Sequence, residues 1–389
     1  MQGIEKVYCN VCIKALVAAW RSLMETTPAE ALRRVNYGKS DTFSFDAIPE
    51  IIICKRLRDF DNHAILVTEE LDKVEKRRWP TDSDPALQPL MFFSDPMDRS
   101  KQLRLFLEKI SSGEVINKKV GELMVECNAP KVWEEMFEAP ASITGASIAI
   151  SCVRKGVIVF SVILNCITRT VFVAASIGIF YLELPFFNDT DVNNVDFSYI
   201  VEHGKKLAFM QTKDVCLKSD DFKIFVTFLG KTGYRENFND SMIFVENPDK
   251  FLHHDEPGGP ARILYLSELQ KQYGPIGFIL ANGEKITEWI HWLAFVKFAK
   301  NKEGGDMLKL FEVFIDRPWT KDGILMSTSL PYSIFSYSSE GTPFLDISRL
   351  RDFNSPSKFR SMLVVTPFDN ERIIYTMQQH RYREINLFL

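Results

Sequence analysis

The spacing of apolar residues in the first part of the chain predicts three helices. From residue 3 to about residue 25, apolar side chains recur at intervals of three and four, which is the period of an amphipathic helix. The next stretch, "TTPAEALRR", predicts a new helix in which Thr27 is the N-cap and Pro28 takes the first helical position. A third helix is predicted from residue 46 or 47 to about residue 60.

Two short apolar runs that follow end in acidic residues. They are "HAILVTEE" and "LMFFSDPMD", and each predicts a buried strand followed directly by carboxylates. In an α/β framework, the ends of strands present side chains to a cleft while the strands themselves anchor them. These acids either form a site at the edge of the sheet or are ordinary turn residues, and the pattern alone leaves both interpretations open.

The remainder of the chain predicts further strands and helices. Three β-rich segments separated by short links predict a meander: "TGASIAISCVR", "KGVIVFSVILN" and "RTVFVAAS". Beyond them the predicted strands are "DFKIFVTFLG", "DSMIFVEN", "LKLFEVFID" and "SMLVVTP". The predicted helices are "ITEWIHWLAFVKFAK", "LPYSIFSYSS" and "DNERIIYTMQQHRY". Together these elements predict a mixed α/β protein.

Composition and charge narrow the class of protein. The chain has 389 residues, of which 46% are hydrophobic, and a formal net charge of −4, so it is not broadly basic and we expect no nucleic-acid partner. The most apolar region, residues 141 to 184, is interrupted by Arg154, Lys155 and Arg169 before it reaches the roughly 20 residues of a membrane helix. We therefore expect no membrane association and, since no secretory leader is recognisable, a cytoplasmic location.

Cysteine usage agrees with that expectation. Seven cysteines are scattered without the spacing of a disulfide framework, which favours a reducing compartment. Cys9 and Cys12 form a CxxC pair, but they lie within the first helical pattern and no second pair follows. We interpret them as buried thiols rather than as metal ligands or a redox pair.

The order of these parts resembles that of the inositol monophosphatase and fructose bisphosphatase superfamily. Those enzymes are magnesium-dependent, often lithium-sensitive phosphatases, and their signature is a Glu-Glu pair at the end of one strand, followed by Asp-Pro-hydrophobic-Asp-Gly-Thr/Ser at the end of the next. The counterparts here are "VTEE" (67–70) and "DPMDRS" (95–100). The resemblance covers residues 1–185 well and residues 320–389 loosely.

The resemblance implies an α/β (α+β) fold, a layered α-β-α-β-α sandwich of the sugar phosphatase type. The N-terminal α+β half, residues 1–185, would carry the metal-binding motifs. The C-terminal α/β half, residues 186–389, would carry the substrate-specificity loops. A small phosphorylated substrate and a possible homodimer are also implied.

A magnesium site follows from the same resemblance. Glu69, Asp95 and the backbone carbonyl of Met97 would hold a first Mg²⁺, and Asp95 and Asp98 would share a second, with two or three ions in all. Mg²⁺ takes carboxylate, carbonyl and water oxygens, so clustered acids suit it better than they suit zinc. The alternative for Asp95 and Asp98 is a turn that caps a helix.

The resemblance also implies which residues act on the substrate. Ser100 and Asp46 would orient and deprotonate the attacking water, and Glu70 would support the metal site. The amides of Arg99 and Ser100, at a helix start, would bind the phosphate. Taken alone, Asp46 could instead be a helix-capping residue, and Ser100 could be an ordinary first-turn residue.

Two departures from the family pattern leave two functions open. Arg99 stands where the family has glycine, and the acid of the family's third motif is replaced by Thr328 and Ser329. Other acids that could complete the second metal site are Asp316, Asp322 and Asp346. The chain is therefore either a Mg²⁺-dependent phosphomonoesterase acting on a sugar, inositol or nucleotide phosphate, or a catalytically degenerate relative that binds a phosphorylated ligand or a protein partner.

Overall fold

The computed structural model describes most of the chain up to residue 209, and beyond it a set of strands and a few helical positions. The described residues in the first part are 3–37, 42–68, 78–79, 90–112, 117–138, 140–154 and 157–209. Those in the second part are 223–228, 235–238, 241–245, 278–284, 291, 294, 295, 298, 300–301, 309–315, 335–337, 343–345 and 360–366.

The three N-terminal helices are confirmed. They are α1 (Gly3–Met24), α2 (Pro28–Ala31) and α3 (Ser44–Phe60). Thr27 is the N-cap of α2, as predicted, because its hydroxyl accepts the backbone N–H of Glu30 while the Glu30 carboxylate accepts the N–H of Thr27. This pair of hydrogen bonds satisfies two backbone groups that a helix start would otherwise leave without partners.

A nine-stranded mixed sheet forms the centre of the first part, in the order β13-β8-β7-β6-β5-β4-β3-β1-β2. Its strands are β1 (Ile65–Thr68), β2 (Arg78–Trp79), β3 (Leu90–Asp98), β4 (Ser147–Arg154), β5 (Val157–Asn165), β6 (Thr170–Ala175), β7 (Gly178–Glu183), β8 (Lys205–Phe209) and β13 (Lys300–Asn301). β1 pairs with β3 in parallel and β13 pairs with β8 in parallel, whereas the successive pairs from β3 to β8 are antiparallel. The predicted meander is therefore confirmed as β4 to β6.

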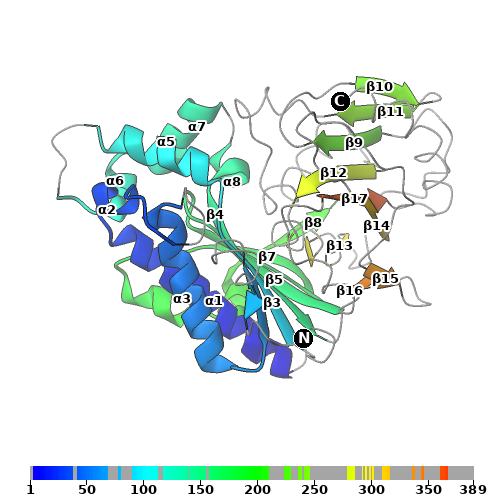
Figure 1. Cartoon of the computed structure of the whole chain (residues 1–389), viewed down its shortest axis with the longest axis horizontal. Coiled ribbons are helices and arrows are strands. Elements are labelled where there is room, and N and C mark those ends of the chain that lie inside the picture. Colours follow the sequence, from blue (N-terminus) through cyan, green and yellow to red (C-terminus); the bar gives the residue numbers. More distant parts are fainter. Residues whose placement is uncertain are drawn as a thin grey trace.

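Further helices lie near the ends of these strands. They are α5 (Ser100–Ile110), α6 (Val120–Glu126), α7 (Ala129–Phe137), α8 (Ala141–Thr144), the 3₁₀ helix η2 (Thr190–Asn194) and α9 (Phe197–His203). In Figure 1, α5 to α8 form one group above the sheet. Trp133 holds this group together, because its ring packs against Phe106 of α5 and its indole N–H donates to Thr144 Oγ1 at 3.0 Å.

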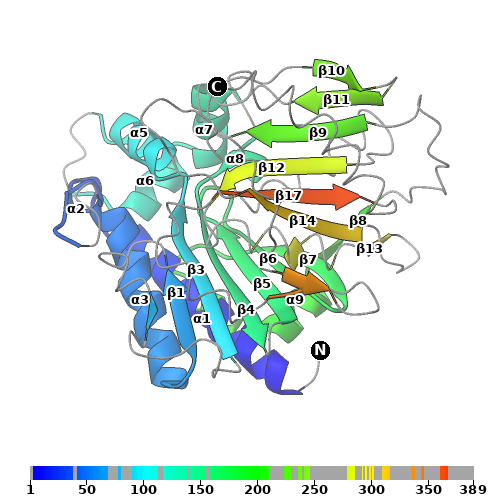
Figure 2. The same cartoon turned by 45° about the vertical axis from the view of Figure 1, so that its right-hand side comes forward.

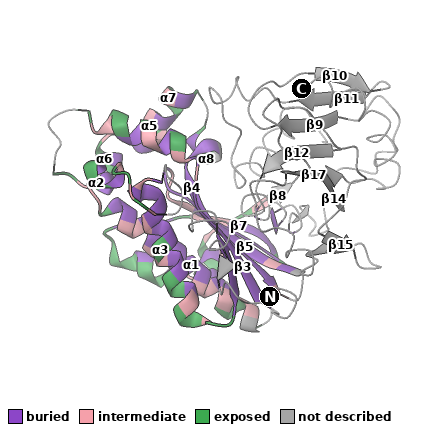
Figure 3. Ribbon diagram, in the orientation of Figure 1, coloured by how far each residue is buried: buried purple, intermediate pink, exposed green. Residues whose placement is uncertain are grey.

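Both faces of the central sheet are buried. α1 and α3 cover one face (Figure 1), and the strands beneath them are largely buried (Figure 3). The rings of Phe92 and Phe160 are buried in the core that these helices share with the sheet. Phe93 points to the other face, since successive strand residues alternate, and it is also fully buried. The buried positions at helical spacing in the C-terminal part are His291, Ala294, Phe295 and Phe298. These four helical positions lie on this other face.

His291 connects these helical positions to the central sheet. Its Nδ1 lies 2.6 Å from Ser151 Oγ on β4 and 3.3 Å from Ser161 Oγ on β5. Ser151 and Ser161 are paired directly across the two strands, so one imidazole meets both hydroxyls. All three side chains are buried, and polar groups removed from water in this way are stabilising only when they are hydrogen-bonded.

A second, six-stranded sheet has the order β10-β11-β9-β12-β17-β14. Its strands are β9 (Lys223–Phe228), β10 (Arg235–Phe238), β11 (Ser241–Val245), β12 (Phe278–Glu284), β14 (Lys309–Ile315) and β17 (Arg360–Thr366). Figure 2, turned by 45°, shows it beside the first sheet. The strands predicted at β9, β11, β14 and β17 are confirmed, and so is the mixed α/β fold class. The division at residue 185 stays a prediction.

One predicted helix is wrong. "LPYSIFSYSS" contains β15 (Phe335–Tyr337), which pairs antiparallel with β16 (Pro343–Leu345). The segment alternates aromatic residues with serines, a pattern that fits a strand at least as well as a helix, and the following "SEGT" favours a turn. The sequence pattern also did not predict α6, α7, β7, β8 or β12.

α1 is rich in apolar residues. Among the described helices it is the one long and apolar enough, over Glu5–Met24, to cross a membrane by length and composition alone. Of that apolar window, 56% is buried inside the protein, and Leu16, Trp20 and Leu23 are essentially inaccessible to water. α1 lies against α3 and the sheet, as a core helix does (Figure 1).

We expect native alkylation to distinguish the cysteines. Cys9, Cys12, Cys152 and Cys166 are fully buried, and burial raises the pKa of each thiol, which suppresses the reactive thiolate. Cys127 is partly exposed, so iodoacetamide at mildly alkaline pH should modify it well before these four. Peptide mass spectrometry over a time course measures the order. Equally fast modification of Cys9 or Cys12 would contradict their interpretation as buried thiols.

Candidate functional site

The end of β3 makes a tight, irregular turn. Asp95 pairs with Ala149 of β4 and Asp98 pairs with Ser147, so two residues of β3 stand opposite one residue of β4 between these pairs. Proline has no N–H to offer the ladder, which accounts for the bulge at Pro96. Asp95 Oδ1 accepts the backbone N–H of Met97 at 3.2 Å, so the carboxylate is held within the turn.

Arg99 connects this turn to α5 in a left-handed conformation, with φ 68° and ψ 39°. Glycine adopts this conformation without cost, whereas an L side chain pays about 1 kcal/mol or more. The left-handed conformation explains why glycine suits this position in the family pattern. In this chain an arginine adopts that conformation instead. Arg99 is only 7% exposed, so its side chain is held inside the protein.

Ser100 and Asp46 are brought together, although 54 positions separate them in the chain. Ser100 Oγ lies 2.6 Å from Asp46 Oδ1 and 3.0 Å from the Met97 carbonyl oxygen. Both neighbours are acceptors and the hydroxyl has one proton, so it can donate to only one of them at a time. The shorter distance and the charge of a carboxylate favour donation to Asp46.

Asp46 has a structural contact as well. Its Oδ2 accepts the backbone N–H of Phe43 at 3.1 Å, which caps the start of α3. The Asp46 carboxylate therefore has both predicted roles: Oδ2 caps the helix, and Oδ1 accepts from Ser100. The side chain is 4% exposed, and these two hydrogen bonds restrict its orientation.

Glu50 is a second buried carboxylate on α3 that the sequence analysis did not identify. It lies four positions after Asp46, on the same face of the helix, and is fully inaccessible to water. Its Oε2 accepts a short hydrogen bond from the hydroxyl of Thr68, the last residue of β1. One turn further along, burial raises the pKa of the Cys54 thiol and the Glu50 carboxylate raises it more. The signal available in the sequence was the four-residue spacing of two acids on a largely apolar helix.

The two strand ends are aligned. β1 and β3 are parallel, with Thr68 opposite Ser94. The residues that follow these two in the sequence are Glu69 and Asp95. Glu69 and Glu70 lie outside the described residues, as do the candidate third-motif positions Asp316, Asp322, Thr328, Ser329 and Asp346.

No metal cluster can be assembled from the described part alone. Within it, no three His, Cys, Asp or Glu side chains lie close enough to hold a metal ion together. The described oxygen donors at the site are the carboxylates of Asp95 and Asp98 and the carbonyl of Met97, a donor set that suits a hard cation such as Mg²⁺. A ligand set that includes Glu69 is therefore a prediction.

Solved structures similar to this one were found across most of the chain. Several of them are described as inositol monophosphatases or as members of that family. One is CysQ from Bacteroides thetaiotaomicron, described as a bacterial member of the inositol monophosphatase family, with 11% identity, a TM-score of 0.45 and coverage of 93% of this chain and 97% of that one.

Two further structures are similar. SuhB from Mycobacterium tuberculosis has 10% identity and a TM-score of 0.40, with 96% of each chain covered. The inositol monophosphatase from Anabaena (Nostoc) has 10% identity and a TM-score of 0.39, with 90% of this chain and 97% of that one covered. A scan of protein families found no match to the sequence, and a search of curated proteins found none.

Proposed function

We propose that this protein is a Mg²⁺-dependent phosphomonoesterase that hydrolyses a small phosphorylated sugar, inositol or nucleotide with a metal-activated water and no covalent intermediate. The observation that carries the proposal is the Ser100 to Asp46 hydrogen bond, which forms beside the turn that bears Asp95 and Asp98. A partly buried hydroxyl and a buried carboxylate from distant segments, adjacent to two further carboxylates, match the parts that such a reaction needs.

Glu69, Asp95 and the Met97 carbonyl would hold one Mg²⁺, and Asp95 and Asp98 would share a second. Bound there, the ions would neutralise the phosphoryl charge and lower the pKa of a water molecule. Asp98 is the residue of β3 whose side chain is partly exposed, at the end of an otherwise buried strand. It is therefore placed where a substrate can approach.

Asp46 and Ser100 would deliver the proton-transfer step. In the resting arrangement the hydroxyl donates to the carboxylate, so its oxygen lone pairs are available to accept a proton from the attacking water. Asp46 then receives the proton through Ser100. The second Asp46 oxygen, fixed by the Phe43 N–H, keeps the carboxylate from rotating away.

The start of α5 would bind the phosphate. α5 has eleven residues and no side chain caps its N-terminus among the described contacts. Its first N–H groups and the positive end of the helix dipole favour an anion. The Arg99 guanidinium would add a positive charge that a glycine would not supply.

A phosphate-release assay tests the proposal directly. Purified protein is incubated with a panel of phosphorylated sugars, inositols and nucleotides, with Mg²⁺, without it, and with added Li⁺. We expect release from at least one substrate that requires Mg²⁺ and is inhibited by Li⁺. Magnesium-independent release would exclude the mechanism.

A second function is favoured by a specific feature, the arginine at the family's glycine position together with hydroxyl residues at the third motif. A catalytically degenerate relative would bind a phosphorylated ligand without hydrolysing it. Isothermal titration with the same panel separates the two: saturable binding without phosphate release supports this alternative.

The buried free thiols of the described part fit the cytoplasmic location that we also propose.

Thr68→Val is expected to weaken metal use. It removes the hydrogen bond to Glu50 at the residue directly before Glu69, and loss of such an outer contact typically lowers metal affinity about tenfold or more. The Mg²⁺ concentration for half-maximal activity should rise accordingly. Thr144→Val is the matched control, because Thr144 is a buried threonine whose hydroxyl accepts from Trp133 away from the carboxylates. An equal change in both variants would argue for a general loss of stability.

A further inference from the structure

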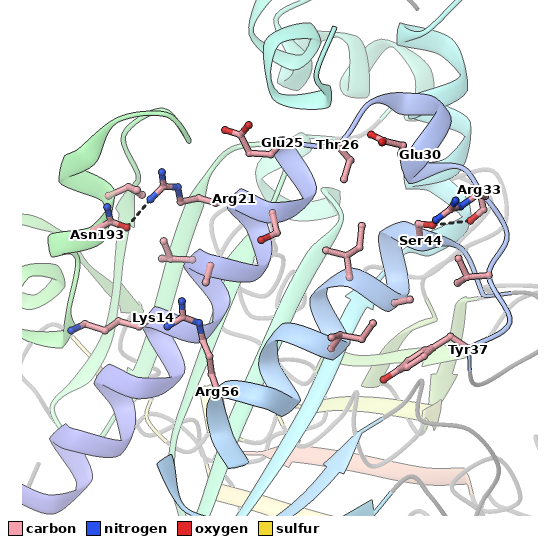
Figure 4. Close-up of a pocket in the computed structure, with 18 of the residues that line it drawn as sticks. Lys14, Arg21, Glu25, Thr26, Glu30, Arg33, Tyr37, Ser44, Arg56 and Asn193 are labelled. Atoms are coloured by element: carbon pink, nitrogen blue, oxygen red, sulfur yellow. Dashed lines mark hydrogen bonds between the residues drawn. The ribbon is translucent and has the colours of Figure 1, made fainter. Parts of the chain in front are cut away.

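A broad groove lies on the outer side of α1 and α3, away from the sheet that their inner sides cover (Figure 4). Its volume is about 1160 Å³. η2 and Val195 border it next to α1, and Val35 and Tyr37 border it next to α3. The groove is separate from the Ser100 and Asp46 pair, because neither side chain lines it.

The floor of the groove is apolar. It is formed by small and aliphatic side chains of the two helices, which are Val17, Ala18, Ala47, Ile48 and Ile51. Ile51 is 49% exposed, so its apolar side chain is largely accessible at the groove. Covering this surface would be favourable, since burial of apolar area is the main driving force of association.

The charges around the floor are mainly positive. Four basic side chains and two acidic ones line the groove: Lys14, Arg21, Arg33 and Arg56, and Glu25 and Glu30. Among the described residues no carboxylate forms an ion pair with Lys14 or Arg56. Within the described part of the chain, Lys14 and Arg56 therefore have no carboxylate that neutralises them.

Both acids already have partners within the protein. Glu25 forms an ion pair with Lys119, outside the groove. Glu30 accepts hydrogen bonds from the N–H and hydroxyl of Thr27, and these bonds lower the pKa of its carboxyl. Glu25 directly follows the last residue of α1, so the acids stand at one end of the groove (Figure 4). The middle of the groove keeps its positive character.

We propose that this groove binds an acidic amphipathic helix of another protein. The part of α1 that lines it, from Lys14 to Glu25, is about 17 Å long, which matches about three turns of a bound helix. Apolar side chains at positions i, i+3, i+4 and i+7 of the ligand cover the floor, and flanking aspartates or glutamates meet Lys14, Arg21 and Arg56. A bare anion would leave Ile51 uncovered, and a basic segment would be repelled.

The test uses synthetic peptides of about four helical turns. The first has leucines at helical spacing with glutamates beside them. The second has the same composition in scrambled order, and the third has lysines in place of the glutamates. Fluorescence anisotropy with the full-length protein measures each affinity. We expect the first peptide to bind and the other two to bind at least about tenfold more weakly.

Variants of the protein test whether the first peptide binds in the groove. Ile51→Glu and the double change Lys14→Glu with Arg56→Glu should each weaken the first peptide about tenfold or more, the former by loss of apolar contact and the latter by loss of charge pairing. Lys55→Glu is the control, because Lys55 is exposed on α3 but does not line the groove. Circular dichroism confirms that all variants are folded.

Three results would overturn the proposal. Equal binding of the scrambled peptide would show that helical amphipathicity is not recognised. Binding that is lost in the charge variant but unchanged in Ile51→Glu would identify a simple anion site. A concentration-dependent dimer in sedimentation velocity that Ile51→Glu dissociates would assign the groove to a second copy of this chain.

Discussion

Asp46→Asn is expected to lower kcat for Mg²⁺-dependent phosphate release by about 100-fold or more, because general base contributions are commonly of that size. Asparagine keeps the shape of the side chain and can still accept the Phe43 N–H, but it cannot take a proton at neutral pH. KM should change little, since Asp46 is not among the groups assigned to phosphate binding. Steady-state kinetics on any substrate found in the panel measures both values.

A double-mutant cycle sharpens this prediction. Ser100→Ala should lower kcat by a similar factor, and the combined variant should be scarcely slower than either single one, because the two groups act in sequence on one proton. Asp61→Asn is the matched control: Asp61 also accepts backbone N–H groups, at the other end of α3, with no serine partner. Additive losses in the cycle would show that Asp46 and Ser100 act independently, contrary to the proposed relay.

His291→Leu is expected to destabilise the protein by about 2–4 kcal/mol, because it leaves buried hydroxyls without their partner. Ser151 and Ser161 both approach the His291 Nδ1, and all three side chains are buried. Urea denaturation followed by tryptophan fluorescence gives the free energy of unfolding. The change should appear as a lower midpoint, since the hydrogen bonds tie the C-terminal helical positions to β4 and β5.

A triple variant tests whether the lost stability comes from the unpaired serine hydroxyls. Adding Ser151→Ala and Ser161→Ala to His291→Leu removes the stranded hydroxyls, so the triple variant should recover part of the lost stability. His63→Leu serves as the control, because His63 is exposed beyond the end of α3 and should change the midpoint little. A triple variant less stable than His291→Leu alone would mean that the serines are stabilised by other contacts.

The elements with a clear hydrophobic period were predictable. α1 and α3 have apolar residues at helical spacing, and β4 and β5 are dense in β-branched residues, so local pattern and final structure agree. β15 was not predictable in the same way, because three strand residues become a strand only through pairing with β16. Short elements carry little local signal, and their partners decide their conformation.

Some residues of the candidate site were likewise identifiable from the sequence, and others were not. The motif residues Asp95, Pro96 and Asp98 were identifiable in the sequence, since an acid-bearing turn after an apolar strand has a recognisable pattern. Glu50 was harder to identify, because a glutamate in a helix is ordinarily exposed and its spacing of four from Asp46 is only a weak signal. The packing of α3 against β1 removes it from water and places Thr68 beside it.

The sequence by itself determined the mixed α/β class, the N-terminal helices, the meander and the position of an acidic turn at the end of β3. Each of these depends on interactions between residues near one another in the chain. Only the tertiary structure decided that Ser100 meets Asp46, that His291 joins two serines across β4 and β5, and that α1 and α3 leave an apolar, cation-lined groove on their outer side. These depend on contacts between distant segments, and such contacts exist only once the core has packed.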